Sequence, residues 1–450
     1  MGKKPLFLSA ASALIFSNYA LAADSVIVEP EPTEYVRVCD AYGSGFFYIP
    51  GTETCIRFSG FVRSAYEKFD IDVDTGSQLN GALFPLFAFP PIDEFNFAAW
   101  GTRARLNIDT RNETDWGTLR AIYRLEAGQS NTDSDIDMDV ALISLAGFRA
   151  GYSGANYWSS NHDFGWVNAE AVGFNAAGIV ADDGFYGFDD GTVFDYTFAE
   201  NGFAITVGIE DPGTSYGRDN FGNTTNNGGT DSRVNYYAGI NYSASWGGIS
   251  FTAAHDSIAP KIETATFGGF FTGHAITDTG GWAYKVSANL NLSDYISGGS
   301  VWGMYMYDGD YNTDYVHANG LLENPDSAWG VAYQMDLTDE VEFWVNYWDV
   351  DGGKANIFNG PGLPTFNFFG SNIDFIAGTA IDEGGVRQFG VGLNWYPKAA
   401  KGFHVKASYF RGEVDNTGHI LVCNGFFTIA GPQGCSFDYD GYTVSLRRDF

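Results

Sequence analysis

The chain ends on Gly441-Tyr-Thr-Val-Ser-Leu-Arg-Arg-Asp-Phe450, a stretch in which apolar and polar side chains alternate. The apolar positions are Tyr442, Val444, Leu446 and Phe450, and the polar positions are Thr443, Ser445, Arg447 and Asp449. Because successive side chains of a β-strand point to opposite faces, this strand has one face for lipid and one for water. It predicts the closing strand of a transmembrane β-barrel, with Phe450 as the barrel-closing terminus. Arg448 departs from the alternation, but near the chain end a long cation can reach the lipid headgroups.

The N-terminus predicts a secretory signal peptide over residues 1–22. Two lysines give it a positive start, an apolar run too short to cross a bilayer covers residues 6–16, and Ala20-Leu-Ala22 is a typical cleavage site. No later stretch reaches the roughly eighteen apolar residues of a membrane helix. The composition, with 57 Gly, 26 Tyr and 38 Phe, favours strands over helices.

The formal net charge of -31 argues against nucleic acid as a partner, because a basic binding surface is absent. The six histidines show no metal-ligand spacing, and the chain has no G-x-S-x-G elbow. We therefore expect no metal, no cofactor and no enzymatic activity. The enzyme alternative would be an outer-membrane enzyme with a Ser/His pair at one rim, for which His255 and Ser257, two positions apart, are the candidates.

The four cysteines form two near pairs, Cys39 with Cys55 and Cys423 with Cys435. An exported chain can oxidise them, which favours disulfides over free thiols. Four cysteines allow three connectivities, so the pairing is a choice between alternatives. We expect the two local bonds, one at each end of the barrel.

From Ile56 onward, segments of about ten residues alternate between apolar and polar side chains. We count sixteen of them, an even number, as single-chain bacterial barrels require. A soluble sandwich also alternates, so this pattern alone does not decide the class. The segments begin near Ile56, Asn96, Gly117, Met138, Phe148, Thr192, Phe203, Arg233, Gly248, Trp282, Gly299, Ala328, Val341, Val386, Gly402 and Asp440.

The connections between the segments alternate between short and long. The short ones are 112–116, near 147, 200–202, 245–247, 293–298, 338–340 and 397–401, and the long ones are near 70–95, 128–137, 158–191, 211–232, 258–281, 308–327, 351–385 and 413–439. Outer-membrane barrels show this asymmetry, with short periplasmic turns and long external loops. We therefore predict an all-β, 16-stranded antiparallel barrel in the bacterial outer membrane, with both termini periplasmic.

Tryptophans mark both ends of the predicted strands. Those next to long connections are Trp100, Trp282 and Trp329, and those at short turns are Trp116, Trp246 and Trp395. Two such sets are typical of the aromatic girdles at the two membrane interfaces, although large aromatics can also simply end strands.

Three parts of the chain resemble the alphaproteobacterial general porins. They are the opening Glu-Pro-Glu-Pro-Thr-Glu-Tyr-Val-Arg-Val-Cys-Asp-Ala-Tyr-Gly (29–43) with Phe-Tyr-Ile-Pro-Gly-Thr-Glu-Thr-Cys (47–55), the hairpin Asp195-Tyr-Thr-Phe-Ala-Glu-Asn-Gly-Phe203, and the terminal Phe450. The resemblance implies an outer-membrane homotrimer, surrounded by lipid and lipopolysaccharide, for passive diffusion of small hydrophilic solutes and ions. It also implies that the third external loop folds inward. The chain would then comprise the signal peptide (1–22), a periplasmic lead-in (23–55) and the barrel (56–450), with a constriction loop at about 158–191.

The expected constriction combines an acidic loop with a basic wall. The loop contains no Lys or Arg, and its acidic residues are Asp163, Glu170, Asp182, Asp183, Asp189 and Asp190. The inward positions of the first three segments carry Arg57, Arg63, Arg103, Arg105, Arg111, Arg120 and Arg124. Placing an arginine in lipid at the midplane would cost about 2–4 kcal/mol, so the inward orientation is favoured. Opposed charges at a narrow point would favour small dipolar solutes over apolar ones.

Other hypotheses remain open at this point. The arginines could instead pair with inward acids such as Glu67, Asp109 and Glu126 to hold the wall. A substrate-selective channel of similar architecture would need a row of aromatic side chains along the lumen. A secreted soluble β-protein such as a lectin would share the alternation without the sorting of loop lengths.

Overall fold

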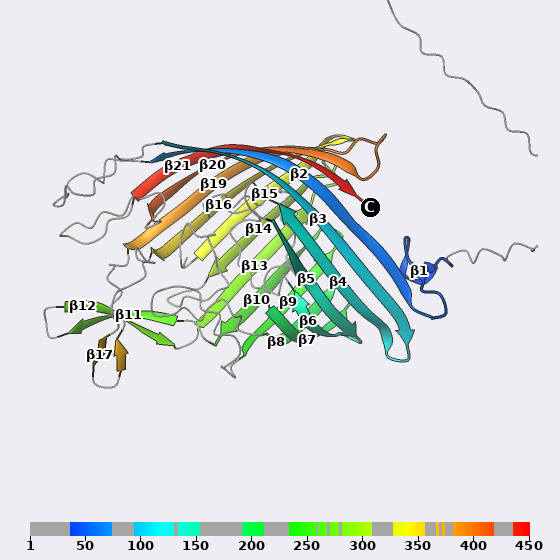
Figure 1. Cartoon of the computed structure of the whole chain (residues 1–450), viewed down its shortest axis with the longest axis horizontal. Coiled ribbons are helices and arrows are strands. Elements are labelled where there is room, and N and C mark those ends of the chain that lie inside the picture. The colour runs from blue at the N-terminus through cyan, green and yellow to red at the C-terminus, as the bar shows by residue number, and fades with distance from the viewer. Residues whose placement is uncertain are drawn as a thin grey trace, which may run out of the picture.

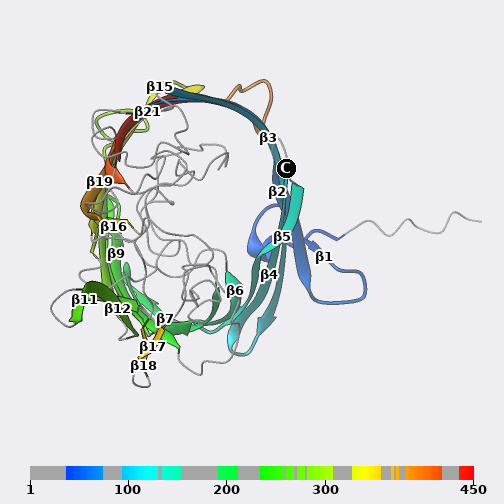
Figure 2. The same cartoon turned by 60° about the vertical axis from the view of Figure 1, so that its left-hand side comes forward.

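The alternating segments form strands in the structure, a computed structural model. It describes residues 37–73, 94–129, 134–153, 191–210, 234–257, 260–267, 271–278, 281–307, 327–355, 366–368, 371–373, 381–417 and 435–450. Each strand pairs antiparallel with its neighbours along the chain, and β2 pairs with both β3 and β21, which closes the sheet. Figures 1 and 2 show the resulting barrel from two directions.

The barrel of the described chain has sixteen strands, as the alternation predicts. They are β2 (Cys55–Val73), β3 (Glu94–Thr114), β4 (Gly117–Gln129), β5 (Ser134–Leu145), β6 (Phe148–Ser153), β7 (Gly191–Glu200), β8 (Phe203–Glu210), β9 (Asn235–Ala244), β10 (Gly247–Asp256), β13 (Gly281–Asn291), β14 (Ser300–Tyr307), β15 (Ser327–Thr338), β16 (Val341–Ala355), β19 (Ile381–Trp395), β20 (Phe403–Thr417) and β21 (Cys435–Asp449). Three strands, β5, β19 and β21, begin four or five residues earlier than expected. Among the described residues, no helix has the length and apolar character needed to cross a membrane.

The closing seam between β2 and β21 confirms the interpretation of the final strand. The two strands are paired from Phe61↔Asp449 to Val73↔Phe437, and Gly60 and Phe450 exchange two backbone hydrogen bonds of 3.0 Å. Tyr442, Val444 and Leu446 are exposed outward, while Thr443 and Ser445 are buried inside and Arg447 and Asp449 are half-buried. The guanidinium of Arg448 donates to the carbonyl of Lys401 at a short turn, so this cation does reach the end of the barrel.

Short turns and long connections segregate to opposite ends, as predicted. Figure 1 shows the C-terminus and the start of the described chain at the same end of the barrel. Tight turns such as Asn201-Gly202, with φ of 52° and 83°, join strands at that end, where φ > 0 at both residues suits a two-residue hairpin. Two of the long connections contain hairpins that the sequence did not predict. These are β11 (Pro260–Phe267) with β12 (Phe271–Asp278), and β17 (Phe366–Phe368) with β18 (Ser371–Ile373).

The six girdle tryptophans are all exposed on the structure's surface. The other large exposed side chains lie on the same outward faces, such as Ile205 and Val207 on β8 and Phe251 on β10. Exposed apolar residues on the outward faces of a closed barrel match the lipid-facing surface of an outer-membrane protein.

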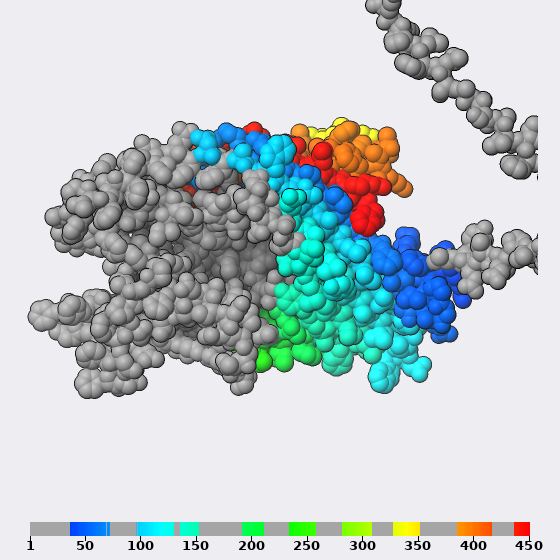
Figure 3. All heavy atoms as spheres, viewed as in Figure 1, coloured from blue at the N-terminus to red at the C-terminus, as the bar shows by residue number. Residues whose placement is uncertain are grey.

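A small lead-in precedes the barrel. It contains a short 3-10 turn, η1 (Asp40–Tyr42), and β1 (Phe47–Tyr48), which pairs with the start of β2. A disulfide joins Cys39 to Cys55 with a Cα–Cα distance of 6.0 Å, which confirms the first expected pair and excludes a cross-link from either of these to the C-terminal cysteines. Cys423 lies outside the described residues, so its pairing with Cys435 stays a prediction. In the space-filling view, the lead-in (blue) projects at the end where the C-terminus (red) lies (Figure 3).

Candidate functional site

The seven predicted arginines lie on the inner face of β2, β3 and β4. On β2 the buried Arg63 alternates with the exposed Val62, and on β3 the inward positions alternate with the exposed Trp100. The register places Arg63 opposite Arg103 and Arg111 opposite Arg120. Cations from three neighbouring strands therefore gather on one side of the lumen.

The carboxylate of Asp109 is the centre of the group nearest the short turns. Its side chain is only 2 % exposed. Arg111 donates to it from Nε (3.1 Å) and Nη2 (2.7 Å), and Arg120 donates from Nε and Nη2, both at 3.0 Å. Nη2 of Arg57 lies 3.5 Å from Oδ2 of the same carboxylate. Three guanidiniums thus share one carboxylate, and each is held in a defined direction.

Glu126 and Asp139 hold the arginines farther along the wall. Nε of Arg105 donates to Glu126, and Nη1 of Arg103 lies 3.7 Å from the same carboxylate. Arg124 donates to Asp139 at 2.9 Å. Asp139 reaches the lumen at a register shift between β4 and β5, since a bulge re-aims the side chains next to it.

These ion pairs test the alternative hypothesis that the arginines stabilise the barrel wall by pairing with inward acids. Asp109 and Glu126, two of the acids named for that role, do bind arginines of the group. Such pairing orients the guanidiniums without removing their charge from the lumen. The two roles are therefore compatible.

Phe61 is the centre of a group of cations that the sequence did not reveal. Its ring points inward, and the guanidinium carbons of Arg447, Arg105 and Arg63 lie 4.0, 5.1 and 5.9 Å from the ring centroid. Cations within about 6 Å of an aromatic face are attracted by its quadrupole. Arg447 joins the group only because barrel closure pairs it with Arg63. The position of Arg447 on the polar face of the final strand was the signal in the sequence that its side chain points inward.

A second unpredicted network lies on β6, β7 and β9. Arg149 donates twice to the carboxylate of Asp195, with Nε at 2.9 Å, and Tyr237 donates its hydroxyl to the same carboxylate at 2.7 Å. Gly208 on β8 makes room for this contact, since a Cβ there would lie 2.5 Å from Cζ of Tyr237. The alternation along these strands was the available signal for their inward positions, but it does not show which of them meet.

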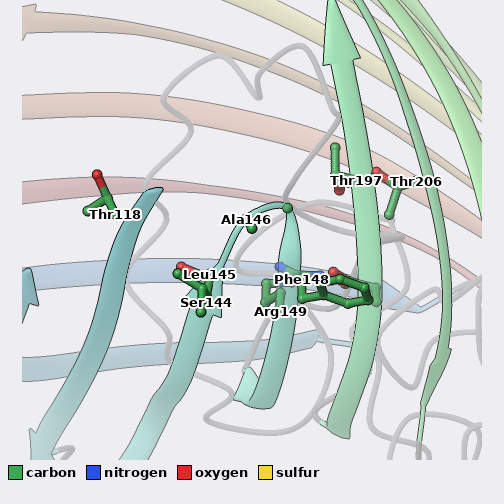
Figure 4. Close-up of a pocket in the computed structure, with 10 residues that line it drawn as sticks. Thr118, Ser144, Leu145, Ala146, Phe148, Arg149, Thr197 and Thr206 are labelled. Carbon is green, nitrogen blue, oxygen red and sulfur yellow. Dashed lines mark hydrogen bonds and ion pairs between the residues drawn. The ribbon is translucent and has the colours of Figure 1, made fainter. Parts of the chain in front are cut away.

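A cavity of about 370 Å³ lies beside this network, among β4 to β8 and the turn that joins β5 to β6. Figure 4 shows Thr118 on one side of that turn and Thr197 and Thr206 side by side on the other. The lining residues are Thr118, Ser144, Leu145, Ala146, Gly147, Phe148, Arg149, Asp195, Thr197 and Thr206.

Inward aromatic side chains of β16, β20 and β21 lie flat over glycines of neighbouring strands. Figure 2 shows β16 and β19 across the barrel from β4 and β5. A Cβ on each of these glycines would come within 2.7 Å of the ring above it, and the rings are 1–6 % exposed. The pairs are Trp344 over Gly392, Trp348 over Gly330, Phe410 over Gly441 and Tyr439 over Gly412. Within the described strands, these rings are too covered to form the exposed aromatic row of a substrate-selective channel.

The acidic half of the expected constriction cannot be placed, because Asp163, Glu170, Asp182, Asp183, Asp189 and Asp190 lie outside the described residues. The residues of the enzyme alternative are described. His255 stacks on the outward ring of Tyr236 at a centroid distance of 4.5 Å, and Ser257 bonds to the amide oxygen of Asn235. His255 thus lies among outward aromatic side chains, with the ring of Trp282 also 4.9 Å away.

Comparison with known proteins agrees with this architecture. Residues 24–408 match the family model described as "Porin subfamily". Porin Omp2b of Brucella suis is 32% identical over 381 residues, covering 79% of this chain and 87% of that protein, and Porin Omp2b of Brucella abortus is 31% identical over the same shares. The crystal structure of the outer membrane channel DcaP of Acinetobacter baumannii aligns over 90% of this chain and 99% of its own with a TM-score of 0.52. At 14% identity that likeness concerns the fold alone. The chain therefore belongs to the alphaproteobacterial porin family and is a general porin, a channel of the outer membrane.

Proposed function

We propose that the arginine wall of β2–β4 and the acidic connection at about 158–191 form the constriction that sets ion selectivity in this porin. The observation that carries the proposal is the convergence of guanidiniums from three neighbouring strands on one inner face. Wall carboxylates hold these cations in place, so their field is ordered before a solute arrives. Three guanidiniums share the single charge of Asp109, which leaves that group of four side chains positive.

From the family resemblance and the order of the loops, we infer that the acidic connection folds inward. It would place carboxylates opposite the arginines and create a transverse field. In a narrow lumen each charge acts through an effective dielectric well below that of bulk water, so constriction charges influence permeation more than charges in external loops do.

Reversal potentials in a salt gradient test this proposal, at low ionic strength where screening is weakest. Arg103→Gln with Arg105→Gln should raise cation preference. Asp182→Asn with Asp183→Asn should move preference towards anions.

The matched control for the arginines is Arg387→Gln with Arg411→Gln, because both side chains are more than half exposed on outward positions of β19 and β20. This variant should change selectivity much less. Equal shifts from the inner and outer arginine pairs would mean that the wall does not form the constriction.

We infer further that the protein is a homotrimer, as the family resemblance implies. A local patch on the outward face of β2 and β3 supports this inference, because the small or hydroxylated residues Ser64, Ala98 and Thr102 there interrupt the large exposed side chains Phe58, Val62 and Trp100. On that face the hydroxyls of Ser64 and Thr102 lie 3.5 Å apart. Hydroxyls and small side chains suit contact with a second protein copy better than contact with lipid. Lipid and lipopolysaccharide would cover the remaining outward band.

Electrophoresis of unheated protein in detergent tests the oligomer. A compact species of trimer mass should convert to monomer on boiling, whereas a single monomeric band before and after boiling would contradict the trimer.

The orientation of the termini is likewise proposed, from the short turns beside them. An epitope inserted at Asn201 should stay hidden from antibody on intact cells, and one inserted at residues 308–326 should be accessible. The reverse result would invert the topology.

A further inference from the structure

We propose that the cavity beside the β5–β6 turn is a binding site for neutral polyhydroxylated solutes of the monosaccharide class. The site borders the arginine wall, since Ser144 pairs with Arg120 in the β4–β5 register, but its lining contains none of the seven wall arginines and the proposal does not depend on the constriction. Its volume of about 370 Å³ lies within the range of small-molecule sites, which runs from roughly 300 to 1,000 Å³. Its polar residues occupy inward positions, so a solute in the lumen can reach it.

The hydroxyl groups of the lining decide the class of ligand. Four of the lining residues carry a hydroxyl, namely Thr118, Ser144, Thr197 and Thr206. A hydroxyl both donates and accepts hydrogen bonds. Its natural complement is a ligand whose own groups do both, which is the property of a sugar hydroxyl. Leu145 and Ala146 add apolar surface to the lining, which suits the C–H faces of a sugar ring.

The charges of the lining cancel within the site. The carboxylate of Asp195 takes two hydrogen bonds from Arg149 and one from the hydroxyl of Tyr237. The Arg149–Asp195 pair therefore presents hydrogen-bonding groups to the cavity without a net charge. A charged solute would have to compete with a short-range pair already formed, whereas a neutral one would not. The neutral lining of the cavity differs from the arginine wall, where three guanidinium groups share one carboxylate.

The lining is also held rigidly before a ligand arrives. The hydroxyls of Thr197 and Thr206 share a 2.7 Å hydrogen bond, and the backbone N–H of Thr197 donates to the carbonyl of Gly147 at 2.9 Å. Ala146 holds a left-handed backbone with φ of 52°, an uncommon conformation for a residue other than glycine or asparagine. With Gly147 at φ of 88°, it forms the same kind of two-residue hairpin turn as Asn201-Gly202. At this turn the alanine keeps the edge of the cavity small and apolar.

Saturation-transfer NMR on the folded protein in detergent tests the proposal, with glucose and glucuronate as probes. We expect saturable glucose binding by the unmodified porin and at least tenfold weaker binding of glucuronate. Ser144→Ala and Thr206→Val each delete one hydroxyl at nearly constant shape, and each should weaken glucose binding about three- to tenfold. The double variant should show the larger loss.

Ser250→Ala is the matched control, because Ser250 and Ser287 form a similar inward hydroxyl pair, 2.6 Å apart, on β10 and β13. It should bind glucose as the unmodified protein does. Should Thr206→Val fail to form a barrel, Ser144→Ala alone carries the test, since it removes one atom from a half-buried side chain. Absence of saturable glucose binding, equal binding of glucuronate, or an equal loss in Ser250→Ala would each overturn the proposal.

Discussion

Replacing Asp109 with asparagine removes the one carboxylate that three arginines share. The asparagine has nearly the same shape, so the change isolates charge. Its amide oxygen still accepts a hydrogen bond. Its NH2 group, however, can only donate, and it faces guanidinium groups that also can only donate. Arg57, Arg111 and Arg120 would then repel one another across the inner wall.

The size of the effect follows from the contacts. Asp109 receives four hydrogen bonds of 2.7–3.1 Å and lies 3.5 Å from a third guanidinium. A hydrogen bond to a charged group contributes about 1.5–3 kcal/mol, and breaking a fully buried ion pair costs about 3–5 kcal/mol. The arginine side chains are 24–38 % exposed, so water replaces part of what they lose. We therefore expect a loss of about 2–4 kcal/mol in the free energy of unfolding.

Urea unfolding of the refolded barrel, followed by tryptophan fluorescence, measures the loss. The same protein in planar bilayers should prefer anions more than the unmodified porin does, because the wall gains one positive charge. Asp339→Asn serves as the control, because this acid bonds to Lys398 on exposed turns outside the lumen. It should leave selectivity unchanged. An Asp109→Asn barrel as stable as the unmodified one would refute the view that this carboxylate organises the wall.

Three further changes follow from the same structure. Ala146→Gly should stabilise the barrel by about 1 kcal/mol, because glycine tolerates the left-handed φ of 52°, and an unchanged urea midpoint would contradict the strain. Gly208→Ala should destabilise the barrel by about 1–3 kcal/mol, because its Cβ would meet Tyr237 at 2.5 Å, whereas Gly303→Ala, with no atom nearer than 3.9 Å, should have little effect on the same urea midpoint. Deleting Phe450 removes both hydrogen bonds to Gly60, so we expect exported but unassembled protein, and a normal yield of heat-resistant oligomer would count against that role.

The sixteen strands could be predicted from the sequence because the alternation of apolar and polar residues is visible within each strand on its own. A strand of a membrane barrel contacts lipid outside and polar surroundings inside along its whole length, so alternation is a local property of ten residues. The segment starting near Thr192 and strand β7, which begins at Gly191, differ by one residue. The hairpins β11–β12 and β17–β18 escaped prediction because they lie in connections outside the alternating segments, where no lipid face imposes the pattern.

The inward orientation of the arginines was also available from the sequence, for the same local reason. Which carboxylate each arginine meets was not, because register and closure decide it. Asp109 and Arg120 meet across a hairpin, but Arg447 reaches Phe61 only when the last strand pairs with the first. Likewise, Arg149, Asp195 and Tyr237 come from three strands, and Gly208 lets them touch. The sequence by itself therefore determined which face each side chain occupies, while only the closed barrel decided the partners, because contacts between distant segments depend on the register of the whole sheet.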